Sequence, residues 1–194
     1  MVDINFYATF AVMNDFVLHT GGYRSLVAYR KTQVIYDLSF YFCNKYLSRG
    51  DRTIDQMVQA ARSGKQNIIE ATEAAITSSE TLLKLLNVAR ASLHELLADY
   101  EDYLRVRNLK IWENGSPEVR SMQKLGREHD NSEYFLAIAQ TRSDEVVANM
   151  AIVLIHQADV LLTRFIQYQY THFVENGGFR EHLTNARLKF RNNH

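Results

Sequence analysis

The feature that most limits how this chain can fold is the scarcity of helix-breaking residues. Its 194 residues contain one proline, Pro117, and eight glycines. Proline and glycine are the strongest helix breakers, and here they fall in short stretches separated by long uninterrupted runs. Those stretches are TGGY (20–23), SRGD (48–51), ENGSP (113–117), KLGREHDN (124–131) and ENGG (175–178). This spacing predicts an all-α protein.

Between these stretches the apolar residues recur with the period of an α-helix. One run advances in alternate steps of four and three: Leu82, Leu86, Ala89, Leu93, Leu96, Tyr100 and Tyr103. Such residues share one side of a helix, which packs along a neighbouring helix. A second run contains Val147, Met150, Leu154, Gln157, Leu161, Phe165, Tyr168 and His172, widened by Ala158 and Leu162. We therefore expect four long helices, at about 23–47, 52–76, 79–108 and 143–174.

The remaining helices are expected to be short. The connection at about 109–142 has two candidates, 116–125 and 131–140, and a final basic helix follows the glycines at 177–178. Ser143, with two acids after it, is a typical helix start. The prediction is an all-α, up-down four-helix bundle with a helical connection and a short C-terminal helix. Residues 21–194 form the single domain, and residues 1–20 form an N-terminal extension to which no role is assigned.

Composition limits the classes of partner and the cellular location. Lys and Arg number 22, as do Asp and Glu, so the net charge is zero and a basic surface must be local. The single cysteine, Cys43, lies in an apolar run and is expected to be buried. One cysteine cannot form an internal disulfide, which fits a reducing compartment. No apolar stretch approaches the roughly 20 residues of a membrane span. We therefore expect a cytoplasmic protein without a membrane partner.

The Ser-Gly-Lys sequence at 63–65 is interpreted as part of a helix and not as a phosphate-binding loop. A phosphate loop of the Walker type needs a glycine five residues before its Gly-Lys pair, where this chain has Gln59. On a helical wheel Gly64 falls in the same arc as Ile54, Met57, Ala61, Ile68, Ala71 and Ala75. Gly64 is therefore predicted to let a neighbouring helix approach closely.

Several segments together resemble a known family. The segments QMVQAARSGKQNIIEA, LLNVARASLHELLADYEDYL and GGYRSLVAYRKTQVIYDLSFYF resemble the four-helix-bundle proteins encoded in intervening sequences of bacterial 23S ribosomal RNA genes. With GGFRE they look similar to the four helix bundle suffix domain, over about 21–191. The resemblance implies a homo-oligomer, since relatives assemble as pentameric rings, and no catalytic residues. One relative binds nucleic acid and a reverse transcriptase.

The chain departs from the family pattern in two places. Where the family often has a proline before its Asn and a glycine after its Glu, this chain has Gln66 and Ala71. The second long helix is therefore expected to run straighter and longer. The first nineteen or so residues fall outside the resemblance.

The polar residues that match the family lie on the second and third long helices, beside their apolar residues. They are Gln56, Ser63, Asn67, Ser92 and Glu95. We interpret them as an inter-helix hydrogen-bond network that fixes the register of the two helices, with a ligand pocket as the alternative. The seven histidines are scattered and give only isolated pairs such as His156 with Asp159. No metal site, cofactor or nucleophile motif is predicted.

Two groups of basic residues are candidates for nucleic-acid contact. They are Arg62 and Lys65 on the second long helix, and Arg180, Arg187, Lys189 and Arg191 near the C-terminus. In a ring-shaped oligomer these basic patches would be repeated and would bind the phosphate groups of nucleic acid. The alternative is that the basic residues are solvated and complement the dipole at a helix end.

Three functions follow from these observations. The first is a non-enzymatic, homo-oligomeric scaffold that binds RNA, DNA or a nucleic-acid-handling protein. The second is a protein–protein adaptor without a nucleic-acid role, which the zero net charge favours. The third, an enzyme, requires a deep pocket containing Ser63, Asn67, Ser92 and Glu95. A continuous basic band on the surface favours the first function, and an apolar groove favours the second.

Overall fold

Every regular element in the described part of the chain is helical. The computed structural model describes residues 22–75, 77–177 and 179–192. Its elements are the short 3-10 helix η1 (Tyr23–Ser25) and the α-helices α2 (Val27–Tyr46), α3 (Arg52–Ala74), α4 (Ser79–Val106), α5 (Pro117–Glu128), α6 (Ser132–Ala139), α7 (Asp144–Asn176) and α8 (Phe179–Asn192). The all-α prediction is confirmed, and the predicted boundaries agree to within a few residues. The N-terminal extension, 1–20, lies outside the described residues.

Short polar side chains begin five of these helices. Asp51, Ser78, Ser116, Asn131 and Ser143 each accept a hydrogen bond from a main-chain N–H in the first turn. Each cap satisfies one of the N–H groups that a helix start leaves without an intrahelical partner. The predicted start at Ser143 is therefore confirmed.

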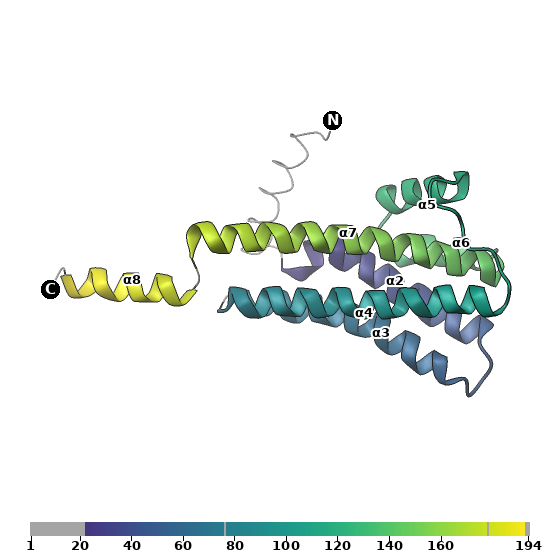
Figure 1. Ribbon diagram of the computed structural model, residues 1–194, viewed down its shortest axis with the longest axis horizontal. Helices are drawn as coiled ribbons and strands as arrows, with labels where there is room; N and C mark the ends of the chain where they lie inside the picture. Colours follow the sequence, from purple (N-terminus) through teal and green to yellow (C-terminus); the bar gives the residue numbers. More distant parts are fainter. Residues whose placement is uncertain (1–21, 76, 178, 193–194) are drawn as a thin grey trace.

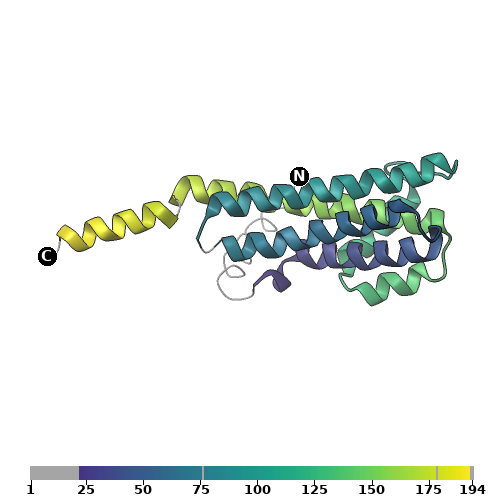
Figure 2. The same ribbon diagram turned by 90° about the horizontal axis from the view of Figure 1, so that it is seen from below.

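The four long helices lie side by side (Figures 1 and 2). α3 packs on α4, α4 on α7, and α2 on both α3 and α7, so each long helix contacts two of the others. The connections 47–51 and 75–78 are short, which makes neighbours along the chain antiparallel. α5 packs against α7 and α6 against α2, so the connection between α4 and α7 covers one end of the assembly.

Most residues of the two predicted apolar runs are buried. On α4 all seven residues from Leu82 to Tyr103 are at most 6% exposed. On α7 the buried run comprises Val147, Met150, Leu154, Ala158, Leu162 and Phe165. Beyond Phe165 the pattern weakens: Tyr168 is half-buried and His172 is exposed. The C-terminal part of α7 therefore extends past the region where other helices cover it on all sides.

The aromatic residues of α2 are spread over its faces. Phe42 is fully buried and its ring meets Tyr100 and Tyr103 edge-on. Phe40, on another face, is 53% exposed. Cys43 is buried as expected, and burial raises the pKa of its thiol to about 12.

The expectation that no apolar stretch reaches membrane-spanning length is wrong for α7. The segment Asp144–Glu175 is long and apolar enough to cross a membrane by length and composition, with a mean hydropathy of 1.7 in its best window. Scattered polar residues such as Asn149 and Asp159 interrupt the run, but the average hydropathy of the segment stays high. However, 61% of that window is buried inside the structure, and the buried core helix of a soluble protein passes the same test of length and composition.

The C-terminal helix α8 projects beyond the end of the four long helices (Figure 1). It follows α7 after residues 177–178, and Gly177 has a φ of 77°, a conformation that glycine adopts without strain. Within the described residues, α8 makes no extensive contact with any other helix. Its side chains Leu183, Leu188 and Phe190 are 43%, 50% and 66% exposed.

Candidate functional site

The outer face formed by α4 and α7 carries a polar cluster at mid-length. Asp159 on α7 accepts hydrogen bonds from two residues of α4, from Nε of Arg90 at 2.7 Å and from Nε2 of His94 at 3.0 Å. Burial alone would raise the pKa of Asp159, but the hydrogen bond and charge of Arg90, with His94 in the same direction, hold it below its ordinary value. The carboxylate is thus charged and already paired, which suits a link between helices better than acid–base chemistry.

The described residues offer no cluster that could bind a metal ion. A site of this kind needs at least three His, Cys, Asp or Glu side chains converging, and no such group occurs among the residues that the structure describes. His156 lies one turn before Asp159 and is exposed.

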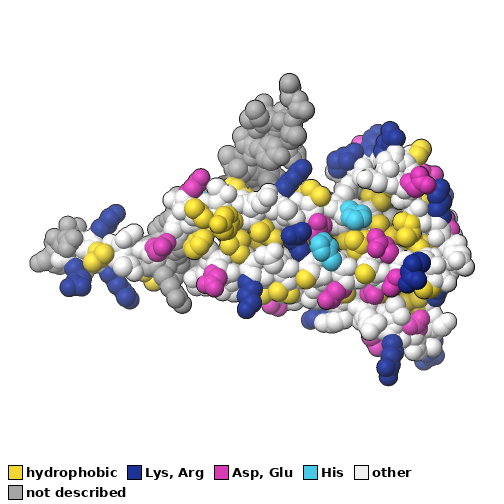
Figure 3. Space-filling model, in the orientation of Figure 1, with side chains coloured by type: hydrophobic (Ala, Val, Ile, Leu, Met, Phe, Trp, Pro, Cys, Tyr) yellow, Lys and Arg dark blue, Asp and Glu magenta, His cyan; other side chains and the backbone are white. Residues whose placement is uncertain are grey.

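Beside this cluster an open groove runs between the start of α4 and the C-terminal part of α7. Its volume is about 480 Å³. The α4–α7 groove is lined by Leu83 and Asn87 from α4, and by Ile166, Gln167, Tyr170 and Thr171 from α7. Tyr170 and Val174, one turn apart, are 60% and 63% exposed. Figure 3 shows hydrophobic side chains gathered over this end of the molecule. Apolar groups gathered on a surface in this way are typical of an interaction site.

Three of the five predicted network residues are hydrogen-bonded to one another between α3 and α4. The hydroxyl oxygens of Ser63 and Ser92 lie 2.9 Å apart, and Asn67 donates from Nδ2 to the hydroxyl of Ser63 at 3.1 Å. Ser92 is buried, whereas Ser63 and Asn67 are half-buried. The bond between the two serines joins the helices at one level and so contributes to their register.

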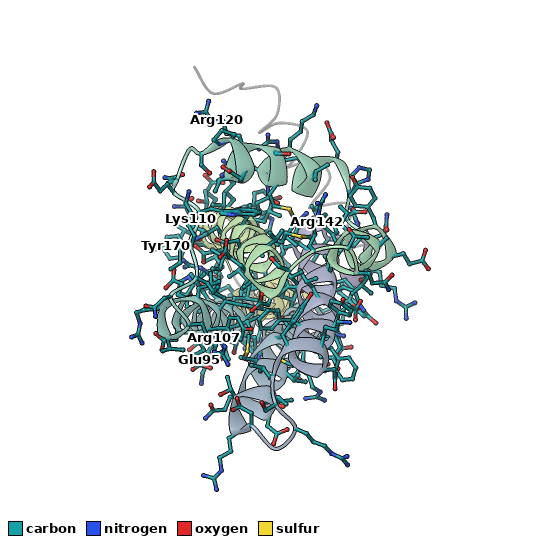
Figure 4. The ribbon with its side chains drawn as sticks, turned by 90° about the vertical axis from the view of Figure 1, so that its right-hand side faces the viewer. Glu95, Arg107, Lys110, Arg120, Arg142 and Tyr170 are labelled. Atoms are coloured by element: carbon teal, nitrogen blue, oxygen red, sulfur yellow. The ribbon has the colours of Figure 1, made fainter. Side chains whose placement is uncertain are left out.

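The other two predicted members lie outside this network. Gln56 and Glu95 are exposed, and Figure 4, which looks along the helices, shows Glu95 at the periphery with Tyr170. Figure 1 shows α3 leaning away from α4 toward its N-terminal end, where Gln56 lies. None of the network residues lines the α4–α7 groove.

Gly64 lies where α3 meets α4, as the wheel predicted. A Cβ atom added to Gly64 would lie 2.9 Å from Cδ2 of Leu93 and 3.6 Å from the main-chain oxygen of Ala89. The missing side chain therefore permits the close approach of the two helices.

The two predicted basic groups are separated in space. Arg62 is exposed, but the ammonium of Lys65 lies 4.3 Å from the ring centroid of Tyr36, a cation–π contact. Arg62 lies about 18 Å along the helix axis from Ala74, the last residue of α3, because each residue of an α-helix adds 1.5 Å. The other group lies on the projecting α8, so the two predicted groups do not form one continuous basic band.

On α8 three of the predicted cations are exposed. Arg187, Lys189 and Arg191 all face solvent, while the side chain of Arg180 lies outside the described residues. No acid follows Glu181 in the sequence, so the end of the chain has a local positive charge. These residues form a small basic patch confined to one helix.

Sequence reasoning missed a buried cation on α2. Lys31 is 2% exposed, and its ammonium donates to the carbonyl oxygens of Gly126 and His129 at the end of α5. Burial lowers its pKa to about 8. The signal lay in the wheel position: Lys31 shares an apolar face with Ala28 and Ile35. The ammonium group of a buried lysine needs hydrogen-bond acceptors unless the residue has a functional role, and here main-chain carbonyl groups accept its hydrogen bonds.

Comparison with known proteins identifies no relative of this chain. No protein-family model, no curated protein and no solved structure matches it. The resemblance to the 23S ribosomal RNA intervening-sequence proteins therefore stays a prediction.

Proposed function

We propose that this protein is a non-enzymatic, homo-oligomeric scaffold that acts through protein–protein contact. In this proposal the four long helices are an up-down four-helix bundle, related to the family that the sequence resembles. The bundle supplies a rigid body, and the surface of α4 and α7 supplies the contact. We place the protein in the cytoplasm, which its buried free thiol favours.

The observation that carries the proposal is the α4–α7 groove. It is open and its lining is largely apolar. Tyr170 in its lining and Val174, one turn further along α7, are both exposed. Aromatic side chains of this kind are enriched where proteins bind one another. The nearby polar side chains support a contact surface more than catalysis, because Arg90, His94 and Asp159 are already bonded to one another.

The test is a comparison of two immobilised full-length proteins, wild type and Tyr170→Glu, exposed to the same mixture of cellular proteins. The substitution places a charge at the groove without touching the buried core. We expect proteins that are retained by the wild type and lost by the variant. Equal retention by the two baits would exclude the groove as the contact surface.

A second candidate, nucleic-acid binding, is favoured by the basic patch on α8. Binding to structured RNA and to duplex DNA over a series of salt concentrations separates the two functions. A steep fall of affinity with salt, lessened by Arg187→Gln, Lys189→Gln and Arg191→Gln, would support phosphate contacts. No binding at low salt would leave the protein–protein function. The assembly state, a pentamer by resemblance, is measured by light scattering on the same sample.

A further inference from the structure

The segment 1–20, to which the proposed function assigns no role, carries an apolar stripe in its sequence. The segment lies outside the described residues. At 100° per residue, the members of the stripe fall within an arc of about 80°: Val2, Phe6, Phe10, Met13 and Val17. Ala8 and Asp15 fall on the opposite side. Steps of four and three residues are the spacing with which an amphipathic helix binds an apolar groove.

The segment joins the described structure at a point that is held against the bundle. It leads into η1, where the ring of Tyr23 meets the ring of Tyr29 edge-on, with 4.8 Å between the centroids. Arg30 on α2 donates a hydrogen bond to the main-chain oxygen of Ser25 at 2.7 Å. η1 contacts both α2 and α3. The residues that follow the segment therefore have a defined place in the fold.

That point lies at the same end of the bundle as the α4–α7 groove. α2 begins there, α3 ends there, and α4 begins after the short connection 75–78 (Figure 2). Leu83 and Asn87 of the groove belong to the first third of α4, and its other residues to the last third of α7. An α-helix is about 10 Å in diameter, and twenty helical residues are about 30 Å long. The segment is therefore long enough to cross the end of the bundle and reach the groove.

The α4–α7 groove is chemically suited to the apolar stripe. Leu83, Ile166 and Tyr170 form the apolar part of its lining, and its volume is about 480 Å³. Val174, one turn beyond Tyr170, is 63% exposed and extends the apolar surface along α7. Contact between the groove and the stripe removes apolar surface of both from water, which favours the docked state.

The core also ends on an unsatisfied donor at this level of α7. Gln169, which directly precedes Tyr170, is 7% exposed, and the described side chains of α7 beyond it are half-buried or exposed. Its side-chain Nε2 has no hydrogen-bond partner among the described residues. A buried amide donor without an acceptor is unfavourable. A segment that crosses this part of α7 would bring oxygen atoms within reach of it.

We propose that the segment 1–20 docks through its apolar stripe in the α4–α7 groove of its own chain. The inference rests on the proposed function, in which the groove is the surface for protein contact, and adds the regulation of that surface. Because the segment is tethered at the same end of the bundle, its local concentration favours this contact over one between chains. A protein partner then binds only the molecules whose groove is free, so its apparent affinity falls with their fraction.

The first experiment measures how fast a thiol reagent reacts with a cysteine placed in the groove of the full-length protein. Asn87→Cys supplies this thiol and leaves the apolar lining intact, while Cys43 is fully buried. We expect Phe10→Glu to raise the reaction rate by about fivefold or more, because the segment no longer covers the groove. The matched control is Ala8→Glu, which places the same charge about 160° from Phe10 and should leave the rate unchanged. Val106→Cys, at the other end of α4, should react at the same rate with and without Phe10→Glu.

A second experiment tests the contact by cross-linking. The double variant Met13→Cys with Asn87→Cys is treated at low protein concentration with a short bifunctional thiol reagent. We expect a link within one chain, identified by mass spectrometry of a digest. The control pairs Asp15→Cys with Asn87→Cys, which moves the first thiol about 160° around the helical wheel and should lower the yield about fivefold or more. A mixture of the single variants Met13→Cys and Asn87→Cys should give no link between chains.

The outcomes separate this contact from the proposed function. If Phe10→Glu leaves the reaction of Asn87→Cys unchanged, the segment does not cover the groove and the inference is overturned. A link that forms only between chains overturns it too, because the segment then docks on a second copy. The proposed function is tested by the retained proteins, which should bind Phe10→Glu more strongly than the wild type and be lost from Tyr170→Glu. If the link forms within one chain but no variant retains a protein, the contact is supported and the proposed function fails.

Discussion

The buried ammonium group of Lys31 donates a hydrogen bond to the main-chain carbonyl oxygen of Gly126, a residue 95 positions away in the sequence. The carbonyl groups at the end of α5 have no partner within the helix, and a cation there also meets the negative end of the helix dipole. Lys31 therefore anchors α5 to α2 through the end of the helix. Among the described residues its ammonium is hydrogen-bonded to main-chain carbonyl groups and to no carboxylate, and the nearby Asp130 pairs with Arg30.

This arrangement predicts a dependence of stability on pH that Lys31→Met removes. Burial lowers the pKa of Lys31 to about 8, with Asp130 opposing the shift and Arg30 adding to it, whereas the unfolded chain keeps the proton up to 10.5. Between pH 7 and 9 the unfolded state therefore binds more protons. The free energy of unfolding of the wild type should rise by about 1 kcal/mol relative to that of Lys31→Met over this interval.

Urea unfolding at pH 7, 8 and 9 measures the effect. The interval stops at pH 9 because Cys43, whose pKa is raised to about 12, acts in the opposite direction once the unfolded thiol ionises. The control is Lys45→Met, a replacement of an exposed lysine on the same helix. Parallel pH profiles for the wild type and Lys31→Met would show that the buried amine does not titrate in this range.

The close contact at Gly64 predicts that a large side chain there destabilises the protein. Even a Cβ atom would lie 2.9 Å from Leu93, so Gly64→Leu forces α3 and α4 apart. The expected loss is roughly 1–3 kcal/mol of unfolding free energy. Thermal melting is the measurement, with Gln59→Leu at an exposed position of α3 as the control. An unchanged melting temperature for Gly64→Leu would contradict the close contact between Gly64 and Leu93.

The hydrogen bond between Ser63 and Ser92 predicts an energetic coupling across α3 and α4. In a double-mutant cycle of Ser63→Ala and Ser92→Ala, we expect a coupling of about 1 kcal/mol, because each serine loses its partner in the single variants. Gln56→Ala and Glu95→Ala, at exposed positions, should change the unfolding free energy by less than about 0.5 kcal/mol. Strict additivity of the two serine variants would mean that the bond contributes nothing to the register.

The helices could be predicted from the sequence because their signals are local. Breakers and caps such as Ser143 lie next to the boundaries they set, and the wheel position of Gly64 follows from its own helix. The sequence also grouped Gln56 with Ser63, but a sequence pattern carries no information on where α3 leans away from α4 (Figure 1). The partners of Lys31 lie 95 and 98 positions away, and the α4–α7 groove joins Leu83 to residues about eighty positions on. Such features arise from tertiary packing, which no local pattern records.

The cluster on the outer face of α4 and α7 predicts a loss of stability in acid that depends on Asp159. Burial raises the pKa of this carboxyl group, but the hydrogen bond and charge of Arg90, together with His94, hold it below the ordinary value of 3.8. A depressed pKa means that the stabilisation is present above the unfolded value and lost as the pH falls through the folded value. Asp159→Asn should therefore lower the unfolding free energy at pH 5 by roughly 1–2 kcal/mol.

The difference between wild type and Asp159→Asn should then shrink as the pH falls from 5 to 2, which denaturant unfolding at each pH measures. The matched control is Asp102→Asn, which breaks a pair with Arg105 whose side chains are 65% and 67% exposed. Because solvent screens that pair, the expected change is below about 0.5 kcal/mol at every pH. If both variants behave alike, the bond between Arg90 and Asp159 is a surface pair of no structural consequence. In that case only the apolar residues of α4 and α7 stabilise the packing of these two helices.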